Sequence, residues 1–413
     1  MSKELNQTRS LLTSLGFILN YDKSILVPSK DCLFLGYKIN SKKFQVYLPE
    51  EKIDHISKQI DKMLSLERCK IREFARFVGL LTSACPAIEY GWLYTKLFER
   101  IKYLNLKTTY DNYDCYMNIP QSLLPDLYWW KHAIKHSVNK IKHDSYDLEI
   151  FSDASTMGWG AVQGYNKASG MWSENERNMH INYLEILAAF FGLKIYAKSL
   201  TNCQILLRID NTTAISYINR MGGIQFPHLT ELAKRLWQWC ESRQLHVYAS
   251  YISSVDNAEA DAESRRIHPD IEWELSSIAF QRIAQAFGYP EIDLFASRLN
   301  KKCCTYVSWH RDPDAYKVNA FTINWTNFYF YAFPPFSVIL KTLRKIVSDK
   351  ARGILIVPLW PTQPWYPIFK SLVISQILYL KPNENLIISP HSSGRNMHTQ
   401  ITLAAAILSG QHS

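Results

Sequence analysis

Four acidic residues lie where the surrounding sequence makes a free carboxylate costly. Asp153 falls in the strand-like stretch EIFSDAS, and Asp210 ends the strand-like stretch CQILLRID. Glu185 lies in a long apolar helical pattern, and Asp261 lies near the start of NAEADAESRR. An ionised carboxylate in an apolar strand is unfavourable unless a cation or a partner compensates it. The four together indicate a cation site, although each taken singly could be a capping or turn residue, most readily Asp210.

The elements expected to position these acids follow an alternating pattern. Three short strands are followed by an amphipathic helix, a strand, two helices, a strand and a last helix. Gly222 and Gly223 end the first of the two central helices. The expected elements cover 148–155, 158–164, 168–173, 182–200, 203–210, 211–221, 227–242, 245–252 and 257–266. This order predicts an α/β fold in which helices flank a mixed sheet.

Four motifs in this region carry a resemblance. The stretches SDASTMGWGA, HINYLEILA, RIDNTTAISYIN and NAEADAESR, in this order and spacing, resemble the ribonuclease H domain of retrotransposon polyproteins, especially of gypsy-like and DIRS-like elements. The resemblance implies a ribonuclease H-like domain over 147–266 that cleaves the RNA strand of RNA–DNA hybrids endonucleolytically. It also implies that Asp153, Glu185, Asp210 and Asp261 are catalytic and bind two Mg²⁺ or Mn²⁺ ions, with Asp153 shared between them.

Carboxylates suit such a reaction because hard oxygen ligands bind Mg²⁺ and Mn²⁺. Two ions roughly 3.5–4 Å apart activate a water and stabilise the leaving oxygen of an in-line phosphodiester cleavage. In the family pattern Asp261 holds the ion on the nucleophile side, and Glu185 and Asp210 hold the other.

The resemblance to ribonucleases H also implies where the substrate binds, and the sequence departs from the family pattern at one position. Ribonucleases H read the minor groove of a hybrid, where 2′-hydroxyls distinguish RNA from DNA. Asn182 and Asn211 adjoin the acids and are candidate substrate-binding residues, or equally helix caps. Many family members carry a histidine shortly before the last aspartate, but SYISSVDNAEAD has none, and His246 is expected to be a strand residue.

The N-terminal flank resembles part of a retroelement reverse transcriptase. Residues 15–39 resemble the end of its palm, so 1–105 are expected to be a palm-end and thumb-like fragment and 106–146 a connector. The stretch 24–39 predicts two strands with a turn at Pro28 and Ser29. No Asp-Asp dipeptide occurs, so no polymerase activity is expected. The rest of a reverse transcriptase is a possible partner.

Residues 290–370 resemble the region of DIRS-like elements that is likened to adenine-N6 methyltransferases, and the C-terminal flank, 267–390, is expected to be a small α/β module. Those enzymes place Asp, Asn or Ser before Pro-Pro-aromatic, whereas Phe333 precedes Pro334 here. A phenyl ring cannot accept a hydrogen bond from an amine, and no glycine-rich cofactor loop is evident. A degenerate module is therefore favoured over a methyltransferase. Residues 391–413 are expected to be a tail.

Charge and composition agree with a nucleic-acid partner. Of the 413 residues, 47% are hydrophobic, which is enough for real cores, and the net charge is +10. Lys and Arg outnumber Asp and Glu by 22 to 15 over 1–146 and by 14 to 9 over 267–413, but are outnumbered 11 to 13 over 147–266. Basic flanks attract polyanions, and an acidic centre suits cations, although ordinary solvated faces explain the charge equally well.

The cysteines and the hydropathy of the sequence indicate the cellular compartment that we expect for the protein. The eight cysteines show no zinc-like spacing and are expected to be reduced, as in a cytoplasmic or nuclear protein. No apolar run reaches 18 residues, so no membrane span is expected. Three functions stay open at this point: a hybrid-specific ribonuclease H, a catalytically inactive nucleic-acid-binding remnant and, less favoured, an adenine-N6 DNA methyltransferase.

Overall fold

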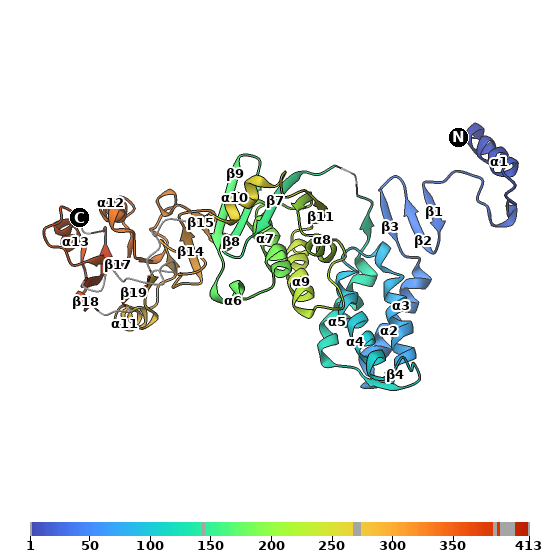
Figure 1. The fold of residues 1–413 in the computed structure, drawn as a ribbon, viewed down its shortest axis with the longest axis horizontal. Helices are drawn as coiled ribbons and strands as arrows, with labels where there is room; N and C mark the ends of the chain where they lie inside the picture. The colour runs from blue at the N-terminus through green and yellow to red at the C-terminus, as the bar shows by residue number, and fades with distance from the viewer. Residues whose placement is uncertain (1, 143–144, 267–273, 383–385, 389–400, 412–413) are drawn as a thin grey trace. The chain divides into compact units, whose positions relative to one another are not determined.

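The computed structural model describes residues 2–142, 145–266, 274–382, 386–388 and 401–411 (Figure 1). The contacts divide the chain into two compact units. The first comprises 1–145 with 220–241, and the second comprises 146–219 with 242–413. The domain boundaries expected at 105, 146, 266 and 390 are drawn from sequence alone and stay predictions.

The first unit is mainly helical, with small antiparallel sheets of order β1-β2-β3-β6 and β4-β5. Its helices are α1 (Ser2–Ser14), α2 (Glu50–Ser65), α3 (Ile71–Thr82), α4 (Lys96–Thr108), α5 (Leu124–His136) and α9 (Pro227–Glu241). Its strands are β1 (Asp31–Phe34), β2 (Tyr37–Asn40), β3 (Gln45–Tyr47), β4 (Arg68–Lys70), β5 (Tyr116–Asn118) and β6 (Asn139–Lys140).

The core of this unit follows the apolar period of its helices. Helix α2 begins after Pro49 and buries Ile56, Ile60 and Met63, which lie on one face at helical spacing. Helix α9 belongs to this unit although its sequence falls within 147–266. Its Lys234 forms an ion pair of 2.7 Å with the buried Asp126. Tertiary contacts thus decide where α9 packs, which its own periodicity does not reveal.

The first hairpin differs from the sequence prediction. The expected strand before Pro28 does not form, and the turn lies instead at Leu35 and Gly36, between β1 and β2. Gly36 adopts a positive φ of 81°, which a glycine takes without strain. The glycine, and not the Pro-Ser pair, therefore sets the register of this hairpin.

Among its described residues the second unit contains a five-stranded, a seven-stranded and a two-stranded sheet, and the five-stranded sheet is ribonuclease H-like. Its elements are β7 (Leu148–Ala154), β8 (Gly158–Gln163), β9 (Asn166–Met171), α6 (Glu174–Arg177), α7 (Ile181–Tyr196), β10 (Gln204–Ile209), α8 (Thr212–Asn219), β11 (His246–Tyr251) and α10 (Ala258–Ser264). The strand order is β11-β10-β7-β8-β9. Strands β7, β8 and β9 are antiparallel, whereas β10 and β11 run parallel to β7. The predicted fold class, an α/β fold with a mixed sheet, is confirmed.

Helices α7 and α10 pack on opposite faces of this sheet. A Cβ atom on Gly192 of α7 would lie 3.3 Å from the Ala161 Cβ, while a Cβ on Gly160 would meet α10. Adjacent residues of a strand point to opposite faces, so these two contacts place the two helices on the two faces of β8. Both helices lie against the green strands β7 and β8 in Figure 1.

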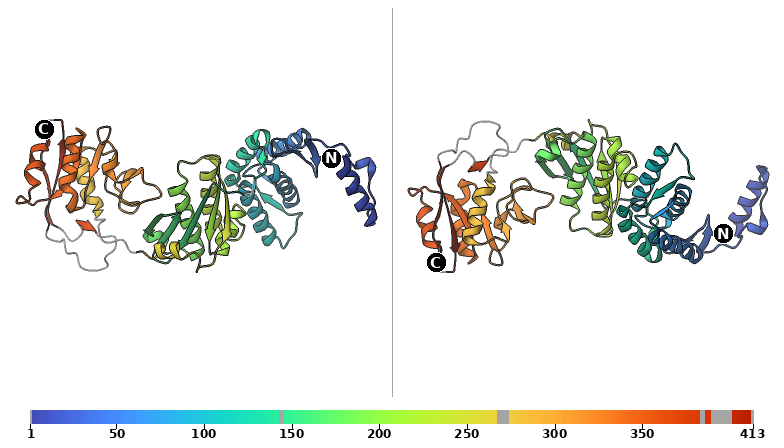
Figure 2. Two further views of the ribbon diagram at one scale, coloured as in Figure 1. Left: turned by 90° about the horizontal axis from the view of Figure 1, so that it is seen from above. Right: turned by 90° about the horizontal axis from the view of Figure 1, so that it is seen from below.

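The second sheet of this unit lies in the C-terminal module, drawn orange to red in Figure 2. Its seven strands have the order β15-β14-β13-β16-β17-β20-β18, and β20 runs in the opposite direction to the other six. The strands and helices of this module are β12 (Glu274–Leu275), α11 (Ser277–Phe287), β13 (Ile292–Asp293), β14 (Thr305–Ser308), β15 (Lys317–Val318), β16 (Tyr329–Ala332), α12 (Ile339–Ser348), β17 (Arg352–Pro358), α13 (Tyr366–Leu372), β18 (Leu378–Leu380), β19 (Ile387–Ile388) and β20 (Leu403–Ser409). Strands β12 and β19 pair with each other in a separate two-stranded sheet.

The expected tail, 391–413, supplies a strand of this sheet. Of these residues, 391–400 and 412–413 lie outside the described part of the chain. Strand β20 pairs with β17 along its whole length and also with β18. The reason is composition, because LAAAILS is apolar enough to be buried on both faces. The sequence prediction of a tail overlooked this run.

Gly160→Ala is expected to destabilise the protein by about 1–3 kcal/mol, because the close packing of α10 on β8 leaves no room for a methyl group. The new Cβ would lie 2.6 Å from the Ser264 backbone nitrogen and would clash with the Ala260 carbonyl oxygen. Urea unfolding of the variant measures the loss. Gly79→Ala in α3 is the control, since a Cβ there meets nothing within 4 Å. Equal stability of the two variants would contradict the packing argument.

Candidate active site

Strand register brings Asp153 and Asp210 side by side. Strands β7 and β10 are parallel, with Arg208 opposite Phe151. Two residues further along each strand, the same register sets Asp210 beside Asp153 at the carboxyl ends of the two strands. Asp153 is buried, and Asp210, just beyond its strand, accepts a hydrogen bond from the Ser254 hydroxyl at 2.7 Å.

Helix α7 contributes the third carboxylate. His180 caps this helix, its Nδ1 accepting from the Asn182 backbone N–H at 3.1 Å. Glu185 then lies in the second turn, and its side chain is only 4% exposed. Because α7 packs on β7, this carboxylate reaches the strand end that carries Asp153. The apolar pattern of the helix thus buries an acid among core side chains.

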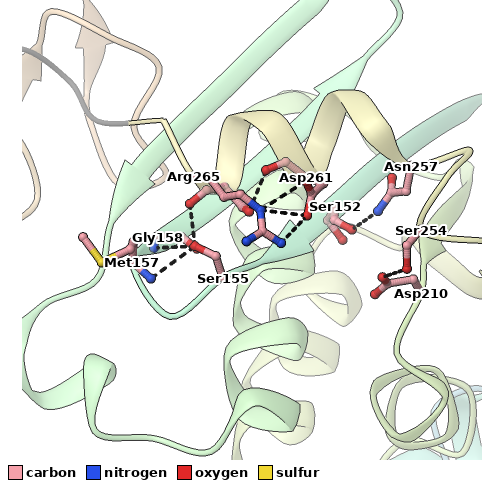
Figure 3. Close-up of polar contacts among 10 residues, drawn as sticks. Ser152, Ser155, Met157, Gly158, Asp210, Ser254, Asn257, Asp261 and Arg265 are labelled. Carbon is pink, nitrogen blue, oxygen red and sulfur yellow. Dashed lines mark hydrogen bonds and ion pairs between the residues drawn. The ribbon is translucent and has the colours of Figure 1, made fainter.

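Helix α10 contributes Asp261, and polar contacts anchor the helix to β7 (Figure 3). The buried Asn257 side chain donates to the Ser152 carbonyl oxygen at 3.1 Å. At the other end of the helix, the Ser155 hydroxyl donates to the Ser264 carbonyl oxygen at 2.7 Å. These bonds fix α10 beside the strand residues that flank Asp153.

The structure gathers three of the four predicted acids into one cluster. Ligand atoms of Asp153, Glu185 and Asp210 all lie within 4.8 Å of one another, close enough to hold a metal ion. Among the described residues, Asp153 Oδ2 and Glu185 Oε2 are buried without a hydrogen-bond partner. Buried unpartnered carboxylate oxygens are the chemistry that a divalent cation satisfies, so these residues fit such an ion. Asp261 lies outside this group of three.

Burial and mutual repulsion raise the pKa values of the two buried acids. Burial raises the pKa of Glu185 to about 9, and the charges of Asp153 and Asp210 add to the effect. The pKa of Asp153 is raised, mainly by burial, with further contributions from Asp210 and Asp261. A hydrogen bond from Ser264 and the charge of Arg265 act in the opposite direction on Asp153. Without an ion, the cluster therefore reduces its charge by retaining a proton.

Asn182 and Asn211 bond to each other beside the cluster. The Asn211 side-chain amide donates to the Asn182 side-chain oxygen at 3.0 Å, and the Asn211 oxygen accepts from the Ala214 backbone N–H at 2.9 Å. Asn211 therefore caps α8, one of the two roles considered for it. The pair ties the start of α7 to the end of β10, which carries Asp210. Their role as substrate contacts stays a prediction.

Several residues of the site were not singled out from the sequence. Ser254 and Asn257 bond to groups that are distant in sequence, so no local pattern identifies them. Arg265 was detectable, because it follows Asp261 by four residues on a helix, a spacing at which opposite charges meet. His246 begins β11, as expected.

The C-terminal module has a separate pocket of about 150 Å³ at the carboxyl ends of β13, β14 and β16. Its lining is mostly apolar and includes Phe295, Trp309, Phe333 and Pro335. Strand order reverses at β13, and open α/β sheets bind ligands at such a point. Phe333 is buried, so the position expected to accept a hydrogen bond is an apolar wall.

Comparisons with known proteins relate the chain to viral polyproteins. It is 28% identical over 274 residues to the "Enzymatic polyprotein" of Cauliflower mosaic virus (strain CM-1841), an alignment that covers 61% of this chain and 36% of the viral protein. It is 29% identical over 217 residues to the "Enzymatic polyprotein" of Carnation etched ring virus, covering 50% and 30%. The chain thus spans about a third of the length of these relatives. No protein-family model matches it.

Solved structures with similarity to the chain include two kinds of protein. One is the RNase H1 of Halobacterium salinarum NRC-1, with 16% identity, a TM-score of 0.24, and coverage of 28% of this chain and 92% of that one. Another is a foamy viral protease-reverse transcriptase in complex with double-stranded DNA, with 15% identity, a TM-score of 0.28, and coverage of 61% and 51%. At these scores the fold assignment rests on the strand order described above.

Within the described residues, no helix has the length and apolar character needed to cross a membrane.

The raised pKa of Glu185 predicts a pH dependence of stability in metal-free buffer. Between the ordinary glutamate pKa of 4.5 and the raised pKa of about 9, the folded protein holds a proton that the unfolded chain releases. The free energy of unfolding therefore falls as pH rises across this window, by at most about 1.4 kcal/mol per pH unit. Unfolding in EDTA at several pH values should show a smaller slope for Glu185→Gln. Glu174→Gln, at an exposed position of α6, should keep the wild-type slope. Equal slopes for all three proteins would contradict the prediction.

Proposed function

We propose that the chain is a retroelement-derived ribonuclease H that hydrolyses the RNA strand of RNA–DNA hybrids with two divalent ions, Mg²⁺ or Mn²⁺. The convergence of Asp153, Glu185 and Asp210, with two buried oxygens that lack a partner among the described residues, supports this proposal most directly. The similarity to viral proteins named as enzymatic polyproteins agrees with it.

The roles of the residues follow from their positions. Asp153, on strand β7, would contribute to both ion sites. Glu185 and Asp210 would complete one ion site, and Asp261 would contribute to the other. When bound, the ions supply a nucleophilic water at neutral pH and stabilise the charge on the leaving oxygen. The protein holds the carboxylates in place before the ions arrive, because β7, α7, β10 and α10 fix their backbones.

The proposed substrate is a polyanion, and the charge distribution suits it. The excess of Lys and Arg in 1–146 and in 267–413 flanks an acidic centre. Phosphate contacts by such flanks supply affinity that weakens with salt, and the metal site supplies the chemistry. We infer that the rest of a reverse transcriptase, which the resemblance implies as a partner, would provide the polymerase site that this chain lacks.

Asp153→Asn is expected to lower the rate of hybrid cleavage by about a thousandfold or more, because metal ions contribute several kcal/mol of transition-state stabilisation. The assay follows a hybrid labelled on its RNA strand, with Mg²⁺, with Mn²⁺ and with EDTA. Asp147→Asn is the matched control, since Asp147 precedes the opposite end of β7 and accepts a hydrogen bond from the Gln204 backbone N–H. It should cleave at the wild-type rate.

The outcomes of this assay separate the candidate functions. Equal cleavage by wild type and Asp153→Asn would point to a contaminating nuclease and would overturn the proposal. Binding of the hybrid without metal-dependent cleavage would favour the alternative, a catalytically inactive nucleic-acid-binding remnant. Cleavage of the DNA strand would refute the assigned substrate.

We further infer that the C-terminal module does not transfer methyl groups to adenine. An N6-methyltransferase needs a side-chain oxygen that accepts from the target amine, and Phe333 offers none. Incubation of the protein with duplex DNA and S-adenosylmethionine carrying a labelled methyl group should leave the DNA unlabelled. A working adenine-N6 methyltransferase is the positive control. Metal-independent labelling of the DNA above background would overturn this inference.

A further inference from the structure

Arg265 places a cation against one side of the carboxylate cluster. Its guanidinium donates from Nη2 to Asp261 Oδ1 at 2.6 Å and from Nε to the same carboxylate at 3.0 and 3.1 Å. Figure 3 shows the guanidinium lying across the Asp261 carboxylate. Its charge also acts on Asp153. Asp261, the carboxylate proposed to bind the second ion, is thus already paired with a positively charged side chain.

The cluster is therefore asymmetric. On one side, Asp153, Glu185 and Asp210 converge, and two of their oxygens are buried without a partner among the described residues. On the other side, Asp261 is half-exposed and paired with Arg265. The first side is arranged to take an ion directly. The second side must first release Asp261 from the guanidinium.

The strength of the Asp261–Arg265 pair sets how much this release opposes ion binding. The Arg265 side chain is 66% exposed, and exposed ion pairs are weak and screened by salt. A divalent ion at this place would gain Asp261 and also the charge of Asp153. The pair is therefore weak enough to give way, yet it lowers the affinity of the ion that displaces it.

We propose that the Arg265 guanidinium occupies the position of the ion that Asp261 would bind, so that the two ion sites fill in order. The Asp153–Glu185–Asp210 side fills first, and the Asp261 side fills second, in competition with the guanidinium. Arg265 is a positioning residue, since it acts through Asp261. This inference rests on the proposed two-ion function and adds to it the order of filling and the residue that sets it.

The test is a titration of the full-length protein with Mn²⁺, in which electron paramagnetic resonance counts free ions. Wild type should show a tighter and a weaker site. Arg265→Gln should tighten the weaker site by about two- to fivefold, the range expected for loss of an exposed ion pair, and should change the tighter site less, since Arg265 forms no hydrogen bond to Asp153, Glu185 or Asp210 among the described contacts. Arg265→Lys keeps the charge without the two-pronged contact and should give an intermediate affinity.

Arg266→Gln is the matched control, because Arg266 is the next residue and pairs with Glu263, which is not among the four acids. It should leave both sites as in wild type. An unchanged weaker site in Arg265→Gln, an equal effect in Arg266→Gln, or the absence of a second site in wild type would overturn the inference. Cleavage is measured in parallel. Two sites, of which the weaker depends on Arg265, without hybrid cleavage would overturn the proposed function and leave the role of Arg265 intact.

Discussion

Repulsion between carboxylates that the backbone holds together is the constraint on which the site depends. Asp153 and Asp210 leave adjacent parallel strands at the same register level, and α7 places Glu185 against them. Two such charges 4 Å apart repel by about 4 kcal/mol at an effective dielectric constant near 20. Neither the strands nor the helix can move apart without loss of the sheet pairing and core packing. The charge must therefore be compensated where it lies.

The protein compensates this charge differently on the two sides of the cluster. On the buried side, the raised pKa of Glu185 keeps a proton on the carboxyl group. On the exposed side, Arg265 supplies the positive charge through Asp261. The proton on Glu185 and the guanidinium on Asp261 both reduce the repulsion locally, and both interactions are reversible. A divalent ion can displace a proton or a guanidinium, whereas it could not displace a hydrophobic side chain.

The sequence predicted the strands, helices and acids of the ribonuclease H-like sheet because each has a local signal. Period-2 and period-3.6 patterns marked β7 to α10, and the acids stood out against apolar neighbours. The features that the sequence did not predict depend on contacts between segments that are far apart in sequence. The packing of α9 with residues 1–145, the recruitment of β20 into the C-terminal sheet and the bond from Asn257 to Ser152 each join segments far apart in sequence. No window of local sequence contains both partners, so periodicity could not reveal them.

The energetic cost of burying these carboxylates is relevant to whether the site still binds metal. Asp153 Oδ2 and Glu185 Oε2 are buried and find no hydrogen-bond partner in the part of the chain that the structure describes, which costs stability in the absence of an ion. A protein that only bound nucleic acid would be more stable with an amide or an apolar side chain at position 185, since neither would repel Asp153 and Asp210. Cation binding is the role that makes use of these unfavourable groups. Among the described residues these are two of several buried side-chain atoms without a partner, but only here do such oxygens belong to a group of acids close enough to hold one cation.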